Sequence, residues 1–373
     1  MNTERLYELL EKLTAEAGRV GVTEKLEQLI QHITNQVNEP SNGAHQTSFS
    51  QTLMQLREAL AKSWFVQLTP LESDVLEKMD LDNLVGQRLP NRIAALMRDN
   101  GMLPAVVRDE LGKLSKRLKR GLDDVKNTIA SFQALGLDEG NGLAPGVGEL
   151  ALRIPRDVIN ESFGTFIEDA QFLRDLVSTN VELIEGKHDD LTLRSLASSD
   201  YGIFLEVGPA VVAFTVLTIE RMMAFYKTIL EIRVLRDQLK QRDTPEAVLA
   251  AIEEDLQKRL KDVAKKALAE ALKEFKPKSE AGRTNELKTL AASNFTKLME
   301  RLDKDYDLDG RIGHAEKAPD DPEQKAEHER LIATDQKVRR SIKLIRKQIR
   351  ESKNLKALEY KPDDEPPKPD DDD

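Results

Sequence analysis

The stretch from Tyr201 to Ile219, YGIFLEVGPAVVAFTVLTI, contains the two patterns that decide the fold of this chain. Its first part, YGIFLEV, is rich in aromatic and branched residues, which is typical of a β-strand. Gly208 and Pro209 then precede the most apolar run of the sequence, residues 210–219 (AVVAFTVLTI). A helix that crosses a bilayer needs about 20 apolar residues, so this shorter run predicts the buried part of a long helix that ends near Arg242.

A small α+β unit can be built outward from this strand and helix. Alternating apolar residues over 150–154 predict a short strand, and the pattern over about 156–184 predicts a helix after it. A further apolar segment, 191–196, precedes a Ser-Ser-Asp turn. The sequence therefore predicts a β-α-β-β-α arrangement over 149–242, in which a three-stranded sheet packs its apolar face on two helices.

Helical regions flank this centre on both sides. Residues 1–135 carry apolar residues at helical spacing, and residues 69–72 (TPLE) have the pattern of a capping box with proline at the first helical position. A Gly-rich linker is predicted over 136–148, long C-terminal helices over 243–358, and a disordered acidic tail over 359–373. The predicted fold class is mainly α, with helical bundle regions flanking a small α+β (β-α-β-β-α) centre.

The composition excludes several kinds of chemistry. The 373 residues include no cysteine, which excludes disulfide frameworks, thiol nucleophiles and Cys-ligated metal centres. Charged residues make up 33% of the chain and the formal net charge is −10, which argues against a generic nucleic-acid coat. No phosphate-binding Gly-rich motif, nucleophile elbow or His-Glu-x-x-His motif occurs. We expect a cytoplasmic protein without a membrane span and lean against an enzyme, although catalytic acids brought together only by folding would leave no such pattern.

An acidic segment near the C-terminus has the spacing of a cation-binding loop. Residues 305–316 read DYDLDGRIGHAE and resemble the twelve-residue calcium loop of EF-hand proteins, with a glycine at the sharp turn. The resemblance implies that the calcium ligands would be Asp305, Asp307, Asp309, Glu316 and the backbone carbonyl of Arg311. The alternative interpretation is that 305–316 forms an acidic, solvated loop between helices.

Basic residues dominate the segment 337–356, where one acid, Glu351, opposes them. Apolar residues at helical spacing indicate that these basic side chains lie on a helix. Such a helix could bind phosphates, anionic lipid or an acidic protein surface, and the alternative is a solvated face of a packed or coiled helix. The candidate partner-binding residues are Arg339, Arg340, Lys343, Arg346, Lys347 and Arg350.

The sequence favours a non-enzymatic interaction or scaffold protein. Long, highly charged helices with narrow apolar stripes bury little surface alone, and they gain stability by packing on one another or on a second chain. We therefore expect a protein that self-associates or binds a protein partner through long amphipathic helices, with no cofactor. Two alternatives stay open, namely a calcium-responsive protein that uses 305–316 and a binder of nucleic acid or another anionic partner that uses 337–356.

Overall fold

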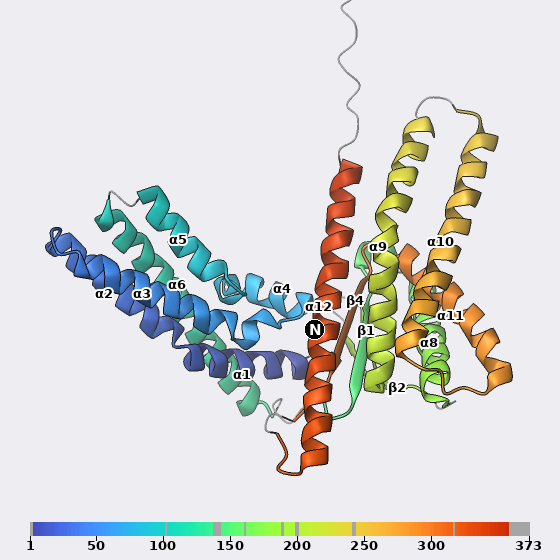
Figure 1. Cartoon of the computed structure of the whole chain (residues 1–373), viewed down its shortest axis with the longest axis horizontal. Helices are drawn as coiled ribbons and strands as arrows, with labels where there is room; N and C mark the ends of the chain where they lie inside the picture. Colours follow the sequence, from blue (N-terminus) through green and yellow to red (C-terminus); the bar gives the residue numbers. More distant parts are fainter. Residues whose placement is uncertain are drawn as a thin grey trace, which may run out of the picture.

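The protein is mainly helical with one small antiparallel sheet at its centre, as the sequence predicts. The computed structural model describes residues 3–100, 103–136, 143–159, 162–187, 190–197, 201–240, 244–315 and 318–357. The N-terminal helices form one arm, the long C-terminal helices form another, and the sheet lies between them (Figure 1). The sheet therefore has a different arm against each of its faces.

The sheet consists of four strands in the order β2-β3-β1-β4, each antiparallel to its neighbours. In chain order they are β1 (Gly148–Arg153), β2 (Thr192–Ala197), β3 (Gly202–Val207) and β4 (Asp307–Ile312). Leu150 of β1 lies opposite Leu205 of β3 on one side and opposite Gly310 of β4 on the other. The three predicted strands are confirmed, and β4 is a fourth that the sequence analysis did not predict.

Strand β4 corrects the expectation of a loop over 305–316. Leu308, Gly310 and Ile312 alternate with charged residues, which is the period of two that a half-buried strand requires. Gly310 lies where the long helix α9 (Pro209–Lys240) approaches the sheet, and a Cβ at this position would lie 3.0 Å from Cγ1 of Val212. The segment is therefore extended where a calcium loop would have to turn.

One hydrophobic core joins the sheet to the helices that follow it. The apolar face of the sheet packs on α8 (Phe163–Glu185) and α9, and α10 (Glu246–Glu274), α11 (Ala281–Leu302) and α12 (Pro322–Ala357) extend the same core. This core runs from Leu150 of β1 to Ile345 of α12. The segments 149–242 and 243–358, which the sequence divides, thus contribute to one cluster of buried side chains.

The most apolar run lies in the middle of this core. Among the described residues, one helical window, Pro209–Tyr226 in α9, has the length and composition of a membrane span, and 67% of it is buried inside the protein. Val211, Phe214 and Ile219 are fully buried there. This burial within the protein is what the predicted core helix requires.

The N-terminal region has a separate hydrophobic core. Thr69 caps its fourth helix as predicted, because Thr69 Oγ1 accepts a hydrogen bond from the Glu72 N–H while the Glu72 carboxylate accepts one from the Thr69 N–H. The helices of this region are α1 (Thr3–Val20), α2 (Val22–Asn38), α3 (Ala44–Ala61), α4 (Pro70–Lys78), α5 (Arg88–Asn100) and α6 (Pro104–Ala134), with short 3-10 turns η1 (Trp64–Val66) and η2 (Asp82–Leu84).

Two predicted segments fall partly or wholly outside the described residues. The predicted linker 136–148 overlaps the undescribed residues 137–142, and the chain after them, residues 143–147, leads into β1. The predicted acidic tail over 359–373 lies outside the described residues altogether. A short helix, α7 (Arg156–Ile159), connects β1 toward α8.

A substitution at Phe295 of α11 tests whether the larger hydrophobic core is assigned correctly. It is fully buried and meets the ring of Phe214 edge-on at 6.0 Å between centroids. We expect Phe295→Ala to lower the free energy of unfolding by about 3–5 kcal/mol, because it leaves a cavity in a packed interior. The control is Phe163→Ala, since Phe163 is 74% exposed. Denaturant unfolding measured by circular dichroism gives both values, and equal losses for the two variants would contradict this core assignment.

Candidate functional site

The two faces of the sheet differ in their chemistry. Leu150, Leu205 and Leu308 are buried on the face that packs on α8 and α9. The residues between them point to the opposite face, because successive side chains of a strand alternate. We call this opposite face the charged face, and its charged members are Glu149, Arg153, Arg194, Glu206, Asp307, Asp309 and Arg311.

Arg5 of α1 inserts its side chain into the charged face and is only 2% exposed. Its Nη2 lies 2.5 Å from Oδ2 of Asp309, and its Nη1 lies 3.4 Å from Oε1 of Glu149. Glu72 of α4 is also within reach, at 4.0 Å from Nη2. A single arginine near the N-terminus thus joins two strands of the sheet to two helices of the N-terminal arm.

Arg311 makes a second connection of the same kind. From β4 its Nε donates to Oε1 of Glu149 at 2.9 Å, and its Nη1 lies 2.5 Å from Oε2 of Glu8 in α1. Arg194 of β2 lies 3.3 Å from the other oxygen of Glu149. Glu149 is therefore surrounded by Arg5, Arg194 and Arg311 inside the protein.

Helix α12 contributes two further arginines to the contact between the arms. Arg339 donates to Oδ2 of Asp335 at 2.6 Å and to Oε2 of Glu72 at 3.0 Å. Arg346 forms ion pairs with Asp307 of β4 and with Asp74 of α4, the latter at 3.0 Å. These contacts tie α12 to α4 on one side and to the sheet on the other.

The two candidate motifs of the sequence meet in the ion pair of Arg346 with Asp307, and their other charges pair mainly with residues outside both motifs. Asp307 and Asp309, expected as calcium ligands, pair with arginines, and Arg311 uses its guanidinium rather than a loop carbonyl. We call the joint cluster the charge network, and its members are Arg5, Glu8, Glu72, Glu149, Asp309, Arg311, Asp335 and Arg339.

The remaining candidate residues are not brought together. Asp305 precedes β4 with a left-handed backbone (φ 69°), and Glu316 lies outside the described residues. Within the described residues, no group of three or more His, Asp or Glu side chains is placed to hold a metal ion. Within the described part of the chain, the fold thus does not bring the predicted calcium ligands together into a cluster.

The outer part of the basic helix has a different role from its inner part. Lys343 Nζ donates to the carbonyl of Val66 in the N-terminal arm at 2.5 Å. Arg340 is exposed, and the remaining two basic residues form ion pairs, Lys347 with Glu351 at 3.6 Å and Arg350 with Asp74 at 4.0 Å. Four of the six predicted partner-binding residues thus contact this chain's own N-terminal arm, namely Arg339, Lys343, Arg346 and Arg350.

Burial and neighbouring charges shift the pKa values within the charge network in opposite directions. Burial raises the pKa of Glu72, but the charges of Arg339 and Arg5 and the Thr69 N–H outweigh it and lower that pKa to about 2. Burial also opposes ionisation of Glu149, whose pKa is nevertheless lowered by Arg311 and Arg5. For Asp309, burial dominates, and its pKa is raised above the usual value despite Arg5.

A cavity of about 740 Å³ adjoins the charge network between α1 and the end of β4. Its polar lining combines both signs of charge, including Glu8, Glu11, Arg311, His314 and Arg339. Arg311 and Arg339 have raised pKa values because, against the effect of burial, neighbouring carboxylates favour their charged forms. They are positioned as fixed cations rather than as groups that exchange protons near neutral pH.

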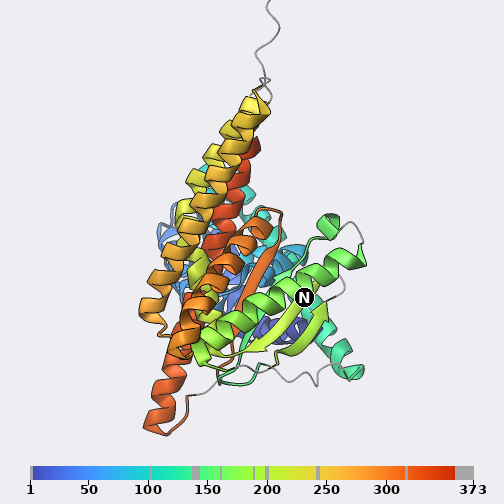
Figure 2. The ribbon, with the colours of Figure 1, turned by 90° about the vertical axis from the view of Figure 1, so that its right-hand side faces the viewer.

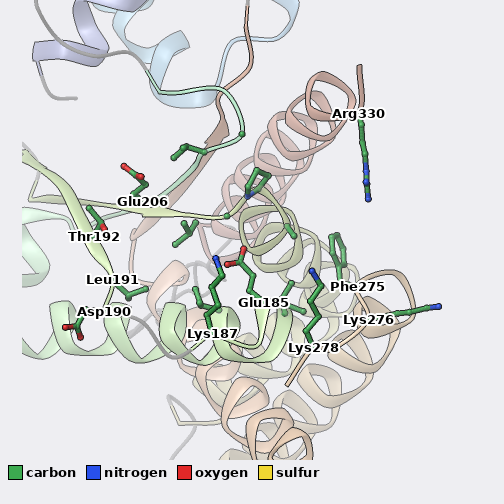
Figure 3. Close-up of a pocket in the computed structure, with 18 of the residues that line it drawn as sticks. Glu185, Lys187, Asp190, Leu191, Thr192, Glu206, Phe275, Lys276, Lys278 and Arg330 are labelled. Atoms are coloured by element: carbon green, nitrogen blue, oxygen red, sulfur yellow. The ribbon is translucent and has the colours of Figure 1, made fainter. Parts of the chain in front are cut away.

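A second cavity, of about 860 Å³, lies at the start of α9. Figure 3 shows the carboxylate of Glu185 between the side chains of Lys187 and Lys278. A Cβ on Gly208 would lie 1.7 Å from Oε1 of Glu185, so this carboxylate already lies against the N-terminus of α9. With Glu206 also in the lining, acids and bases alternate, and the cavity lacks the single sign of charge that an anion site requires.

No protein-family model matches the chain, and no match is found among curated proteins or among solved structures. The charge network includes residues that the sequence analysis did not select, notably Arg5, Glu72 and Glu149. Glu149 carried a usable signal, because it is a charged residue immediately before the predicted strand 150–154. Arg5 carried none, since its partners lie on strands far away along the chain.

Glu72 provides a test of the charge network that depends on pH. Glu72→Gln keeps the shape and the capping hydrogen bonds of α4 but removes one buried charge. We expect it to lower the free energy of unfolding at pH 7 by up to roughly 3–5 kcal/mol, the range for breaking a buried ion pair. Because the folded pKa of Glu72 is about 2 and its ordinary value is 4.5, this contribution is complete above pH 4.5 and is lost as the pH falls toward 2.

The measurement is denaturant unfolding of both proteins at a series of pH values from 7 to 2. The difference between wild type and Glu72→Gln should shrink over the interval from 4.5 to 2. Glu77→Gln is the matched control, because Glu77 is an exposed residue of the same helix. A constant difference over the whole pH range would show that the Glu72 charge does not bind the arms together.

Proposed function

We propose that this protein is a non-enzymatic helical interaction protein, a scaffold that binds a helix of a protein partner along the hairpin of α9 and α10. The observation that supports this function is the extension of both helices beyond their core. Among the side chains that the structure describes, the last buried one of α9 is Ile229 and the first of α10 is Leu256. Figure 1 shows the two helices continuing side by side past the sheet.

The projecting part of the hairpin has an apolar seam that is covered on one side. Ile232 of α9 and Ile252 of α10 are half-buried and continue the stripe of the core. Arg236 and Glu253 form an ion pair that fixes the pairing of the two helices here. The apolar stripe of such a helix is wider than its contact with one neighbouring helix. Part of each stripe therefore stays open on the outer side of the helix pair.

Exposed apolar side chains lie on this outer part. Leu235, near the end of α9, is 57% exposed, and Val248, near the start of α10, is 46% exposed. A third amphipathic helix placed along them would remove this apolar surface from water and complete a three-helix arrangement. This reading extends the sequence-based expectation of long amphipathic helices that gain stability from a partner.

The anionic-partner alternative receives less support. Arg339 and Arg346 of the basic helix contact carboxylates of the charged face and of α4, and Lys343 donates to the N-terminal arm. A phosphate backbone would have to replace these internal partners before it could use the same side chains. A partner that binds along the α9–α10 hairpin would not have to displace these internal ion pairs, and we therefore base the proposal on the hairpin.

Leu235→Glu tests the hairpin as the partner surface. We expect the tagged variant to retain at least about tenfold less of any specifically bound protein than the wild type, because a charge replaces apolar contact. The measurement is quantitative mass spectrometry of proteins retained from the native host's extract. Leu103→Glu is the control, because Leu103 is also exposed, at 59%, but lies just before α6 in the other arm.

Thermal unfolding of both variants accompanies this comparison. Both substitutions lie on the surface, so we expect their unfolding free energies to stay within about 0.5 kcal/mol of the wild type. Retention of the same proteins in the same amounts by wild type and Leu235→Glu would reject the hairpin as the binding surface.

A further inference from the structure

One face of helix α12 is exposed among the described residues. Lys337, Arg340, Leu344 and Lys347 are exposed along it, three or four residues apart, which is the spacing of a single helix face. We call these four residues the basic strip, because each charged member is a cation. Figures 1 and 2 both show α12 beside α9, with its red end toward the tip of the α9–α10 hairpin.

Helix α9 adds a cation and an apolar side chain beside the basic strip. Glu274 accepts from Lys337 Nζ at 2.5 Å through Oε1 and from Arg221 Nη2 at 2.8 Å through Oε2, so both cations lie on the same side of the protein. Phe225 follows Arg221 by one turn, and Leu344 follows Lys337 by two. Phe225 is 53% exposed and Leu344 is 40% exposed. A segment that covered this surface would bury apolar area as well as charge.

The cations of this surface outnumber its carboxylates. Glu351 lies 3.6 Å from Lys347, and Glu274 is shared by two cations. Arg340 has no carboxylate partner among the described residues. The basic strip therefore keeps positive charge that the described part of the chain does not neutralise.

Helix α6 has a second group of exposed basic residues, over 113–120, but these have acids of their own arm nearby. Lys113 Nζ lies 2.7 Å from Oε1 of Glu110, and Lys119 forms an ion pair with Glu27 of α2. The two basic surfaces thus differ in how far the described residues already satisfy them. The α6 group can serve as a matched control for the basic strip.

The segment that follows α12 has the opposite charge. The predicted acidic tail 359–373, EYKPDDEPPKPDDDD, has eight acids and two lysines. Its four prolines favour an extended chain, which lowers the conformational entropy that is lost on binding. At about 3.1 Å per residue, residues 361–373 span about 40 Å, whereas Lys337 lies about 30 Å before the end of α12. The tail is thus long enough to run back along the whole basic strip.

We propose that the acidic tail 359–373 folds back on α12 and lies along the basic strip of the same chain. Covalent attachment favours this occupant, because it holds the carboxylates near the strip at an effective concentration of the order of millimolar. The acids over 363–365 come level with Lys347, and those over 370–373 reach Arg340 and Lys337. The tail thereby shields the strip from external polyanions. This surface is distinct from the α9–α10 hairpin, so the proposal does not rest on the proposed function.

The first test uses the unmodified full chain. A water-soluble carbodiimide joins a lysine amine to a carboxylate in contact with it, and peptide mass spectrometry identifies the joined residues. We expect links within one chain from Lys347 to 363–365 and from Lys337 to 370–373, at least about tenfold fewer in about 1 M salt. No link to the tail, links mainly to Lys113 or Lys119, or links found only in a covalent dimer would overturn the proposal.

The second test measures a distance between two spin labels. Because the chain has no cysteine, Ala333→Cys/Asp371→Cys places one label on the exposed face of α12 and one in the tail. We expect pulsed electron paramagnetic resonance to give one narrow distance distribution. Adding Arg340→Glu/Lys347→Glu should broaden it, and adding Lys116→Glu/Arg117→Glu on α6 should not. A broad distribution in the labelled parent, or the same response to both charge reversals, contradicts the docked tail.

The third test asks whether the tail shields the basic strip. Replacing the seven acids over 363–373 by their amides should tighten binding of a fluorescent heparin oligosaccharide at least about tenfold at low salt. In the background of Arg340→Glu/Lys347→Glu this gain should disappear, and in that of Lys116→Glu/Arg117→Glu it should remain. No gain from the amide replacements, or the same gain in both backgrounds, would show that the tail does not cover the strip.

Discussion

The arrangement of the arms depends on the pairing of buried arginines with carboxylates on the charged face of the sheet. Each arm has its own hydrophobic core, so burial of apolar side chains explains how each arm folds but not how the two are joined. At the junction, Arg5, Arg311 and Arg339 lie away from water, and removing them from water costs free energy unless opposite charges are placed correctly. The docked geometry supplies those charges, and a displaced arm would leave them unpaired.

Ion pairs of this kind fix an angle more strictly than an apolar contact would. Leucines on two faces can slide past one another at little cost, whereas a guanidinium bonded to two carboxylates has a defined position relative to both. Arg339 satisfies this condition with Asp335 in its own helix and Glu72 in the other arm. We interpret the charge network as the feature that holds the two arms at one angle; under the function proposed above, this would present the projecting hairpin in a constant direction.

Much of the fold could be predicted because its signals are local. The strand and helix over 201–219, the capping box at Thr69 and the β-α-β-β-α order depend on patterns a few residues long, and the structure contains them. Strand β4 was missed because its charges suggested a ligand, although Leu308, Gly310 and Ile312 carry the alternation of a strand. Its neighbour, β1, lies far upstream in the chain, so nothing near β4 in the sequence indicated the pairing.

The candidate sites were read from two charged segments that each lacked partners within its own stretch of sequence. A cluster of carboxylates without nearby bases indicates a cation site, and a basic helix without nearby acids indicates an anionic ligand. Both inferences assume that the missing charge comes from outside the chain. Here Asp307 pairs with Arg346, so one segment supplies what the other lacks. The spacing of the apolar neighbours distinguishes internal ion pairs from a site for an external ligand. The alternation around Asp309 and the helical spacing around Arg339 both place a charged side chain toward the interior of the protein, and a buried charge requires an opposite charge nearby.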